Sequence, residues 1–400
     1  MDSRRKFIGA MASGLASTLA SSRVLGANDR LRVGVIGAGQ RGTELVHQAR
    51  ACPNVEIAAF ADVYSKRLDD ARNLVPGVAA YSDHRRLLDD PNIDAVIVAT
   101  PQHLHREHFV HSLEAGKHVY QEKTLAFTLE DAKLMRAAYR KAPKAIVQIG
   151  HQSCSSGQIR DAVNFVATGD VGKITAIRMH WYRNTPHGKA QWARPVYPDM
   201  TPENIFWNSF LGDTPRCDFD PHRFINWRFF EDYSGGNVYE NLSQQLAFWY
   251  KALNLQIPQA ATMTGGLYLW QDGRDVPDTM NVTFQQPEQM LVSWDSGLGN
   301  SQLGITEDVL GSDGTISRSP AGIRYLPQKV NRPDGAEMAG KVVSFPSAHM
   351  QNFVDSIRSG QEPHCAFELG YRVSIACRMA LESFHQGRTV RWDSRTETMV

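Results

Sequence analysis

The stretch LRVGVIGAGQRG, residues 31–42, decides the fold of the N-terminal half. An apolar run rich in β-branched residues leads into Gly37, Gly39 and Gly42, and helix-compatible residues follow. A strand, a tight turn and a helix start in this order are typical of a dinucleotide site, where the glycines allow the turn, the approach of a pyrophosphate and close packing. The phosphates would lie at the helix N-terminus, which favours an anion. A plain glycine turn is the alternative.

A second apolar run, residues 55–61, ends at Asp62. Asp62 has the spacing from the glycines at which dinucleotide sites place a carboxylate. Such a carboxylate accepts hydrogen bonds from a ribose and repels a 2′-phosphate. This position predicts NAD rather than NADP, although Ser65, Lys66 and Arg67 would soften the preference. The alternative role for Asp62 is that of a helix cap after a strand.

Composition limits the classes of function. The 400 residues, 42% of them hydrophobic, suit two domains that each bury a core. The net charge of +1 gives no reason to propose nucleic acid or an anionic membrane as partner. The five cysteines form no CxxC pair, and the histidines form no HExxH motif, so no metal site is predicted.

The first residues, 1–27, resemble a bacterial twin-arginine signal peptide. Arg4 and Arg5 precede a mildly apolar stretch rich in Ala, Gly and Ser. A disordered basic tail is the alternative, and the stretch is too short for a membrane anchor. We therefore expect export by the twin-arginine machinery, a periplasmic or otherwise extracytoplasmic location, and no membrane span in the mature protein. Because NAD is scarce there, the cofactor should be tightly bound and regenerated within each turnover.

Strand and helix patterns alternate through residues 30–152. Apolar strands are expected at 31–36, 55–61, 75–80, 93–99, 117–120 and 145–149, with helix-compatible segments between them. This alternation predicts a doubly wound parallel sheet, which is a Rossmann domain of the α/β class. Its ligands should bind in the loops that follow the strand ends.

Residues 153–400 show a different pattern. Strands are expected at 174–182, 260–269, 280–284 and 290–294 with few helices between them, and helices at 244–253, 349–358 and 370–385. Strands in succession predict a mostly antiparallel sheet in an α+β domain.

Several motifs in one order resemble the glucose–fructose oxidoreductase / inositol dehydrogenase / rhizopine catabolism (Gfo/Idh/MocA) family. They are the glycine turn, Asp62, ATPQHLH at 99–105, LEAGKHVYQEK at 113–123 and VQIGHQ at 147–152, continued by Trp227-Arg228, SGG at 234–236 and WQDGRDVPDT at 270–279. The resemblance implies bound NAD and an open-faced second sheet with one face toward the nucleotide. It also implies that residues 153–400 hold the substrate and take part in a homo-oligomer, either a dimer or a tetramer.

The cofactor contacts are expected in the glycine turn and at the strand ends. The residues predicted to bind the cofactor are Gly37, Gly39, Gln40, Arg41, Gly42, Asp62, Thr100, Pro101, His103, His105, Glu122, Lys123 and Gln152.

Lys123 is the strongest catalytic candidate. It follows a parallel strand, where the nicotinamide end would reach, and a lysine made less basic by burial or oriented by Glu122 serves as a base. The family carries Glu-Lys-Pro here, and its lysine is that base or a substrate ligand. This chain has Thr124 in place of the proline, so the rigid bend is lost. A solvated surface lysine is the alternative.

A second catalytic element follows the glycines at 234–236. The family places an acidic residue and then a histidine four positions later on one helix face, and here these positions hold Glu240 and Gln244. Glutamine does not transfer protons near neutral pH. Either Lys123 and Glu240 carry the proton chemistry alone, or the site has drifted toward binding.

The substrate is expected to be a sugar or polyol. Aromatic faces and planar donors suit its C–H surfaces and hydroxyls, and the predicted contacts are Tyr182, Arg183, His222, Trp227, Arg228 and Tyr233. The preferred function is an NAD(P)-dependent oxidoreductase with captive, internally recycled cofactor. One alternative is an NAD-dependent, redox-neutral glycoside hydrolase that works by oxidation, elimination, hydration and reduction, and the missing histidine weakens its proton relay. Another is a non-catalytic protein that binds NAD or a sugar.

Overall fold

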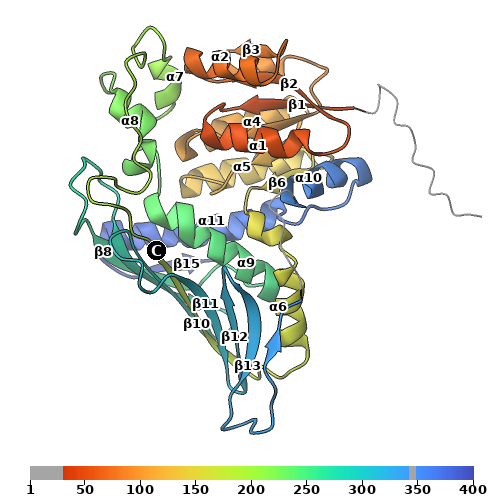
Figure 1. The fold of residues 1–400 in the computed structure, drawn as a ribbon, viewed down its shortest axis with the longest axis vertical. Coiled ribbons are helices and arrows are strands. Elements are labelled where there is room, and N and C mark those ends of the chain that lie inside the picture. The colour runs from red at the N-terminus through yellow and green to blue at the C-terminus, as the bar shows by residue number, and fades with distance from the viewer. Residues whose placement is uncertain (1–29, 342–347) are drawn as a thin grey trace, which may run out of the picture. The chain divides into compact units, whose positions relative to one another are not determined.

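Two β-sheets organise the chain in this computed structural model, which describes residues 30–341 and 348–400 (Figure 1). The expected twin-arginine signal, residues 1–27, lies outside the described residues. Residues 31–400 form one unit in which both sheets share a core. None of the helices in the described ranges is long and apolar enough to span a bilayer.

The first sheet is the predicted parallel one. Its six strands follow the order β3-β2-β1-β4-β5-β6, and every pair is parallel. The strands are β1 Leu31–Ile36, β2 Val55–Ala61, β3 Ala79–Tyr81, β4 Ala95–Val98, β5 His118–Gln121 and β6 Val147–Ile149. All four residues of β4 are buried, as a strand covered on both faces requires. The doubly wound prediction is confirmed.

Helices cover both faces of this sheet. They are α1 Gln40–Arg50, α2 Ser65–Leu74, α3 His84–Leu88, α4 His105–Glu114 and α5 Leu129–Lys141. Side chains alternate along β1, so Val33 and Val35 join one apolar cluster with Leu45 of α1. Ile36 points to the other cluster, which contains Phe109 of α4. The helix α5 begins at a capping box between Thr128 and Asp131.

The second sheet is mostly antiparallel, as expected, with one parallel pair, β7–β10. Its ten strands follow the order β14-β13-β12-β11-β7-β10-β9-β8-β15-β16. They are β7 Ile174–Tyr182, β8 Ala260–Gly266, β9 Thr279–Gln286, β10 Met290–Gly297, β11 Ile305–Gly311, β12 Gly314–Ser319, β13 Gly322–Pro327, β14 Met338–Ala339, β15 Val390–Asp393 and β16 Thr398–Met399. Sequence analysis did not predict β11, β13, β14, β15 or β16.

One face of this sheet packs on helices. Met280, Val282 and Phe284 of β9 are buried, while the residues between them point to the other, more exposed face. The covering helices are α6 Gln158–Ala167, α9 Ser243–Leu253 and α11 Phe367–Gln386. Figure 1 shows α9 and α11 between the two sheets, so they place the second sheet under the nucleotide domain.

Two further segments complete the nucleotide domain. Helix α10, Ala348–Ser359, packs on it through Met350, Phe353 and Val354, with the Phe353 ring 5.7 Å from that of Tyr120. A third apolar cluster joins Tyr64 to the short helices α7 Trp207–Leu211 and α8 Pro221–Ile225. The domain therefore uses chain from far beyond residue 152.

Candidate active site

The glycine turn has the close packing that its sequence predicts. Gly37 has a φ of +94°, and a Cβ there would lie 2.8 Å from the Ala99 carbonyl oxygen. A Cβ on Gly42 would lie 2.0 Å from the carbonyl oxygen of Gly37. Only glycine fits at Gly37 and at Gly42, because in each case a Cβ would clash with a backbone carbonyl oxygen, which cannot move aside as a side chain can. The turn and the helix start therefore form the cradle that a pyrophosphate requires.

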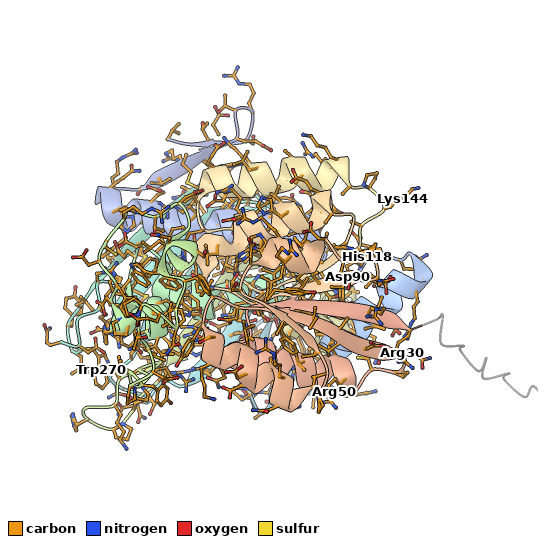
Figure 2. All side chains as sticks on the ribbon, turned by 90° about the horizontal axis from the view of Figure 1, so that it is seen from above. Arg30, Arg50, Asp90, His118, Lys144 and Trp270 are labelled. Atoms are coloured by element: carbon orange, nitrogen blue, oxygen red, sulfur yellow. The ribbon has the colours of Figure 1, made fainter. Side chains whose placement is uncertain are left out.

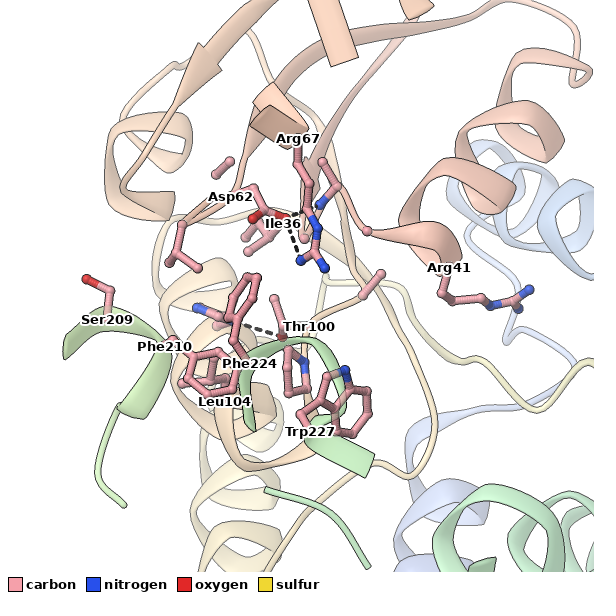
Figure 3. Close-up of a pocket in the computed structure, with 18 of the residues that line it drawn as sticks. Ile36, Arg41, Asp62, Arg67, Thr100, Leu104, Ser209, Phe210, Phe224 and Trp227 are labelled. Carbon is pink, nitrogen blue, oxygen red and sulfur yellow. Dashed lines mark hydrogen bonds and ion pairs between the residues drawn. The ribbon is translucent and has the colours of Figure 1, made fainter. Parts of the chain in front are cut away.

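This turn opens into a cavity of about 760 Å³ (Figure 3). That volume is within the range of sites for cofactors and other small molecules. The predicted site residues that line it are Gly37, Gly39, Gln40, Arg41, Asp62, Thr100, Pro101, Trp227 and Arg228, together with Glu240. Leu104, Phe210 and Phe224 contribute apolar walls. The cavity thus extends from the glycine turn to a predicted catalytic residue.

Asp62 holds the glycine turn in place. Its carboxylate accepts hydrogen bonds from the backbone N–H of Ala38 at 2.7 Å and of Tyr64 at 2.9 Å. It also lies on the cavity wall. The helix-cap alternative is wrong, because the N-cap of α2 is Tyr64 and no side chain caps that helix. Asp62 instead fixes two backbone donors and faces the ligand space.

Arg67 projects into the same part of the cavity (Figure 3). Its guanidinium lies 3.6 Å from the Asp62 carboxylate and over the ring of Phe224, 5.0 Å from the ring centroid. A Cβ on Gly39 would be 3.5 Å from the same group. A fixed positive charge therefore stands beside the carboxylate that was predicted to select NAD.

Orientation of the Lys123 side chain by Glu122, one of the two alternatives considered for this lysine, is not what the structure shows. Glu122 pairs with Arg41 at 2.8 Å. Its one hydrogen bond with Lys123 comes from the backbone N–H of that residue and not from the side chain. The pair joins the first turn of α1 to the end of β5, because Arg41 belongs to the one and Glu122 follows the other. Its role in the structure is to connect elements.

Lys123 instead pairs with Glu240. The ammonium donates to the Glu240 carboxylate at 2.6 Å and to its carbonyl oxygen at 3.0 Å. The side chains are 13% and 9% exposed, so a nearly buried ion pair results. The Lys123–Thr124 peptide bond is cis. The Thr124 hydroxyl donates to the Tyr239 carbonyl oxygen, next to Glu240.

Further donors surround the Glu240 carboxylate. The Arg228 guanidinium lies 3.2 Å away, and the Gln102 amide donates to it at 3.1 Å. Burial by itself would raise the pKa of Glu240, but the charges of Lys123 and Arg228 lower it to about 2. Glu240 is therefore an anion at physiological pH. Gln102 was not singled out from the sequence, although it stands within the ATPQHLH motif.

Gln244 is not joined to this network. Glu240 lies in one π-helical turn, Val238–Leu242, which passes into α9, and π turns are frequent at functional sites. Across the described residues no hydrogen bond or ion pair links Gln244 to Lys123 or Glu240. Its side chain instead lies next to the His151 ring. Neither ring nitrogen of His151 forms a well-aligned hydrogen bond with Gln244 or with another described residue. Burial, reinforced by Lys123, lowers the pKa of His151 to about 3.

His103, His105 and Gln152 stand behind the cavity wall. The His103 ring contacts the Phe210 carbonyl oxygen at 2.7 Å, and His105 contacts those of Thr124 and Thr100 at 2.8 and 3.0 Å. Burial lowers the pKa of both imidazoles. They support the loop after β4. Gln152 lies beyond β6, outside the lining of this cavity.

The predicted substrate residues divide among several places. His222 lines a second cavity, also of about 760 Å³, and Arg194 lines both cavities. Tyr182 is the last residue of β7, and Arg183 follows it. Burial and Asp295 raise the pKa of Tyr182 to about 12. Burial lowers the pKa of Arg183, and the nearby Glu240 carboxylate opposes this effect. Tyr233 is only 1% exposed, so its expected substrate contact is replaced by aromatic packing.

Comparison with known proteins agrees with this geometry. Residues 31–151 match the model of the GFO_IDH_MocA oxidoreductase family, described as an NAD-binding Rossmann fold. Residues 31–151 are thus similar to the Gfo/Idh/MocA family. The matched stretch holds the glycine turn, Asp62 and Lys123.

Two curated relatives show how far sequence similarity extends. The uncharacterised oxidoreductase YrbE of Bacillus subtilis is 29% identical over 48% of this chain and 52% of its own. Myo-inositol 2-dehydrogenase of Thermotoga maritima is 30% identical over 37% of this chain and 44% of its own. The chain thus spans about half the length of the curated relatives it matches.

A solved structure extends the likeness to both domains. The complex of levoglucosan dehydrogenase with NADH and L-sorbose superposes with a TM-score of 0.71 at 19% identity. The match covers 90% of this chain and 98% of that one. The two-domain architecture is therefore that of a solved dehydrogenase.

Proposed function

We propose that this chain is an NAD(P)-dependent oxidoreductase acting on a sugar or polyol. The observation that carries the proposal is the buried Lys123–Glu240 pair, because Glu240 lines a dinucleotide-sized cavity and holds the Lys123 ammonium at 2.6 Å. Relatives named as an inositol dehydrogenase and a levoglucosan dehydrogenase support the substrate class.

The side chains of the pair have separate roles. A bound nicotinamide would accept or supply the hydride, and the chain must move the accompanying hydroxyl proton. Lys123 Nζ is the group that exchanges this proton, since Glu240 is held as an anion and is a weak base. When the substrate is reduced, the Lys123 ammonium donates a proton to the carbonyl oxygen. When the substrate is oxidised, Lys123 first loses a proton to solvent, and the neutral amine then accepts the hydroxyl proton. Glu240 and its donors Arg228 and Gln102 keep the lysine in place. Gln244 takes no part in the proton transfer.

The cofactor is NAD, with NADP bound less tightly. Asp62 favours two ribose hydroxyls over a 2′-phosphate, and this preference supports NAD. Arg67, 3.6 Å from Asp62, supplies a cation that a 2′-phosphate would contact. The preference for NAD over NADP is therefore smaller than Asp62 alone would give.

The protein is exported by the twin-arginine pathway with its cofactor already bound. Arg4, Arg5 and the small residues after them support this route. Within the new compartment the cofactor is reoxidised by a second substrate in each cycle. The more exposed face of the second sheet supports assembly into a homo-oligomer.

The decisive experiment measures nucleotide and turnover together. The purified full chain is denatured to release and identify any nicotinamide nucleotide, and the native protein is mixed with sugars, polyols and glycosides while NADH absorbance is recorded. The proposal expects released NAD and a stable absorbance rise with one sugar or polyol. Release of free sugar from a glycoside without net reduction would instead show the redox-neutral hydrolase.

Lys123→Ala tests the catalytic assignment. Loss of the proton-transfer group should lower turnover by about 10²- to 10⁴-fold while nucleotide stays bound. Lys144→Ala is the matched control, because Lys144 is exposed and points outward at the edge of the same domain (Figure 2). Equal turnover in both variants would dismiss Lys123, and bound nucleotide without any turnover in the unmodified protein would show a binding protein.

A further inference from the structure

Three potential metal ligands meet beside the cavity, outside the Lys123 network. His84 begins α3, while Glu107 and His111 lie one turn apart on α4. One ligand atom of each residue lies within 4.8 Å of the others. We call this group the His84 cluster. Sequence spacing gives no sign of it, because α3 and α4 meet only in the folded chain.

The distances within the His84 cluster are close to those of a coordination shell. His84 Nε2 is 2.9 Å from His111 Nδ1 and 3.9 Å from a Glu107 carboxylate oxygen. Nitrogen ligands of a tetrahedral Zn²⁺, each about 2.0–2.1 Å from the metal, are separated by about 3.3 Å. One separation is shorter and one is longer than this value. Small side-chain rotations that move these ligand atoms by a few tenths of an ångström would bring the three atoms around one ion.

The His84 imidazole is held in place by its neighbours. Its side chain is only 10% exposed, and its ring centroid lies 4.4 Å from that of His108 and 5.2 Å from that of His111. The ring is therefore fixed between the loop before α3 and one face of α4.

A hydrogen bond alone leaves the His84 cluster incomplete. One proton between His84 Nε2 and His111 Nδ1 satisfies those two atoms, and the Glu107 carboxylate remains without a cation. In the described part of the chain, no lysine or arginine lies within ion-pair distance of Glu107. A divalent cation in place of the proton would engage all three residues at once.

We propose that His84, Glu107 and His111 bind a divalent transition-metal ion of the Zn²⁺ class. Two imidazoles and one carboxylate are a donor set that Zn²⁺ accepts with a fourth position left open. His84 and Glu107 also line the large cavity, which gives an ion an entry path from that side. The metal joins α3 to α4, and this inference does not depend on the proposed oxidoreductase activity.

The test uses the full-length, untagged protein, freed of metal with a chelator. Binding of Zn²⁺ is measured by competition with a chromophoric chelator, and Co²⁺ is added as a spectroscopic probe. One equivalent of Zn²⁺ should bind, and Co²⁺ should show the intense visible bands of a four-coordinate site. His111→Ala and Glu107→Gln should each weaken Zn²⁺ binding at least about tenfold.

Control variants separate this site from adventitious binding. His47→Ala removes an exposed histidine on α1 and should leave Zn²⁺ affinity unchanged. His111 and Glu107 are only partly buried, so their variants should fold, and circular dichroism verifies this. Less than one equivalent of bound Zn²⁺ overturns the proposal. Equal affinity in His111→Ala, Glu107→Gln and the unmodified protein also overturns it.

Discussion

Glu240 is the residue on which the site depends. Its carboxylate is within reach of Lys123, Arg228 and Gln102, and these donors more than compensate for its burial. The three partners come from the ends of β5, from the Trp227–Phe229 turn and from the loop after β4. A single buried anion therefore joins three separate segments, and its loss would be felt in both stability and catalysis.

Acid should weaken the fold through Glu240. Its pKa falls from the ordinary 4.5 to about 2 in the folded chain, so its contribution is present above pH 4.5 and is lost as the pH falls toward 2. The contribution is on the order of 3 kcal/mol. Denaturant unfolding of the unmodified protein and Glu240→Gln should show a difference in unfolding free energy that shrinks through this range. A difference independent of pH would contradict the assignment.

Arg67 should set the tolerance for NADP. Arg67→Ala removes the cation beside Asp62, so NADPH affinity should fall about tenfold or more while NADH affinity changes little. Fluorescence titration of nucleotide-free protein measures both affinities. Lys66→Ala is the control, because Lys66 is exposed and pairs with Asp70. An unchanged ratio of affinities would show that Arg67 does not meet the 2′ position.

Residue types were easier to predict than partners. Lys123 and Glu240 were both recognised from their motifs, but the sequence suggested Glu122 as the partner of the lysine. Adjacent residues on a strand end point in different directions, and Glu122 meets Arg41 of α1 instead. The true partner is 117 residues away, and no local pattern identifies it.

At the scale of elements, the glycine turn is the most constrained segment. Gly42 packs against the carbonyl oxygen of Gly37, whereas a Cβ on Gly39 meets only the far end of Arg67. The φ of Gly39 is −70°, which any residue adopts. The two positions therefore have different requirements, one from the fold and the other from the ligand.

Alanine at these two positions should separate folding from binding. Gly42→Ala forces α1 away from the turn and should cost about 1–3 kcal/mol of unfolding free energy. Gly39→Ala should leave that free energy nearly unchanged and weaken nucleotide binding, because its Cβ would face the cavity. Denaturant unfolding and NADH titration of both variants make the comparison. Similar stabilities for the two variants would contradict this account.

One of the strands that sequence analysis did not predict, β11, has a physical explanation. In β11 the buried Glu307 stands where an apolar residue is expected, because it pairs with Arg318 and accepts from Gln245. That buried charge hides the alternation on which strand prediction depends. The parallel strands of the first sheet, by contrast, are short apolar runs with clear glycine and proline boundaries, and they were predicted within a few residues.

At the scale of the molecule, the nucleotide domain is not a continuous segment. Helix α10 lies after the second sheet in sequence and completes an apolar cluster of the first domain. Phe353 packs there against Tyr120 of β5. The predicted boundary at residue 152 therefore describes the parallel sheet but omits this returning helix, whose docking depends on side chains distant in sequence.

Removing the Phe353 ring should destabilise the nucleotide domain. Phe353→Ala leaves a cavity beside Tyr120 and should cost about 3–5 kcal/mol of unfolding free energy. Gln351→Ala on the same helix is the control, because Gln351 is only half-buried and pairs with Asp355. Bound NADH should protect the unmodified protein more than Phe353→Ala in thermal unfolding. Equal stability of the two variants would show that α10 is dispensable.

The return of α10 has a consequence for biosynthesis. A ribosome releases residues 30–152 long before it translates residues 348–359, so the nascent first domain leaves the exit tunnel with an uncovered apolar patch around Tyr120. Domain-by-domain folding during translation, common in multidomain proteins, is therefore incomplete here until almost the whole chain has been made. Chaperones that bind exposed apolar surface would therefore stay bound longest to the nascent N-terminal domain.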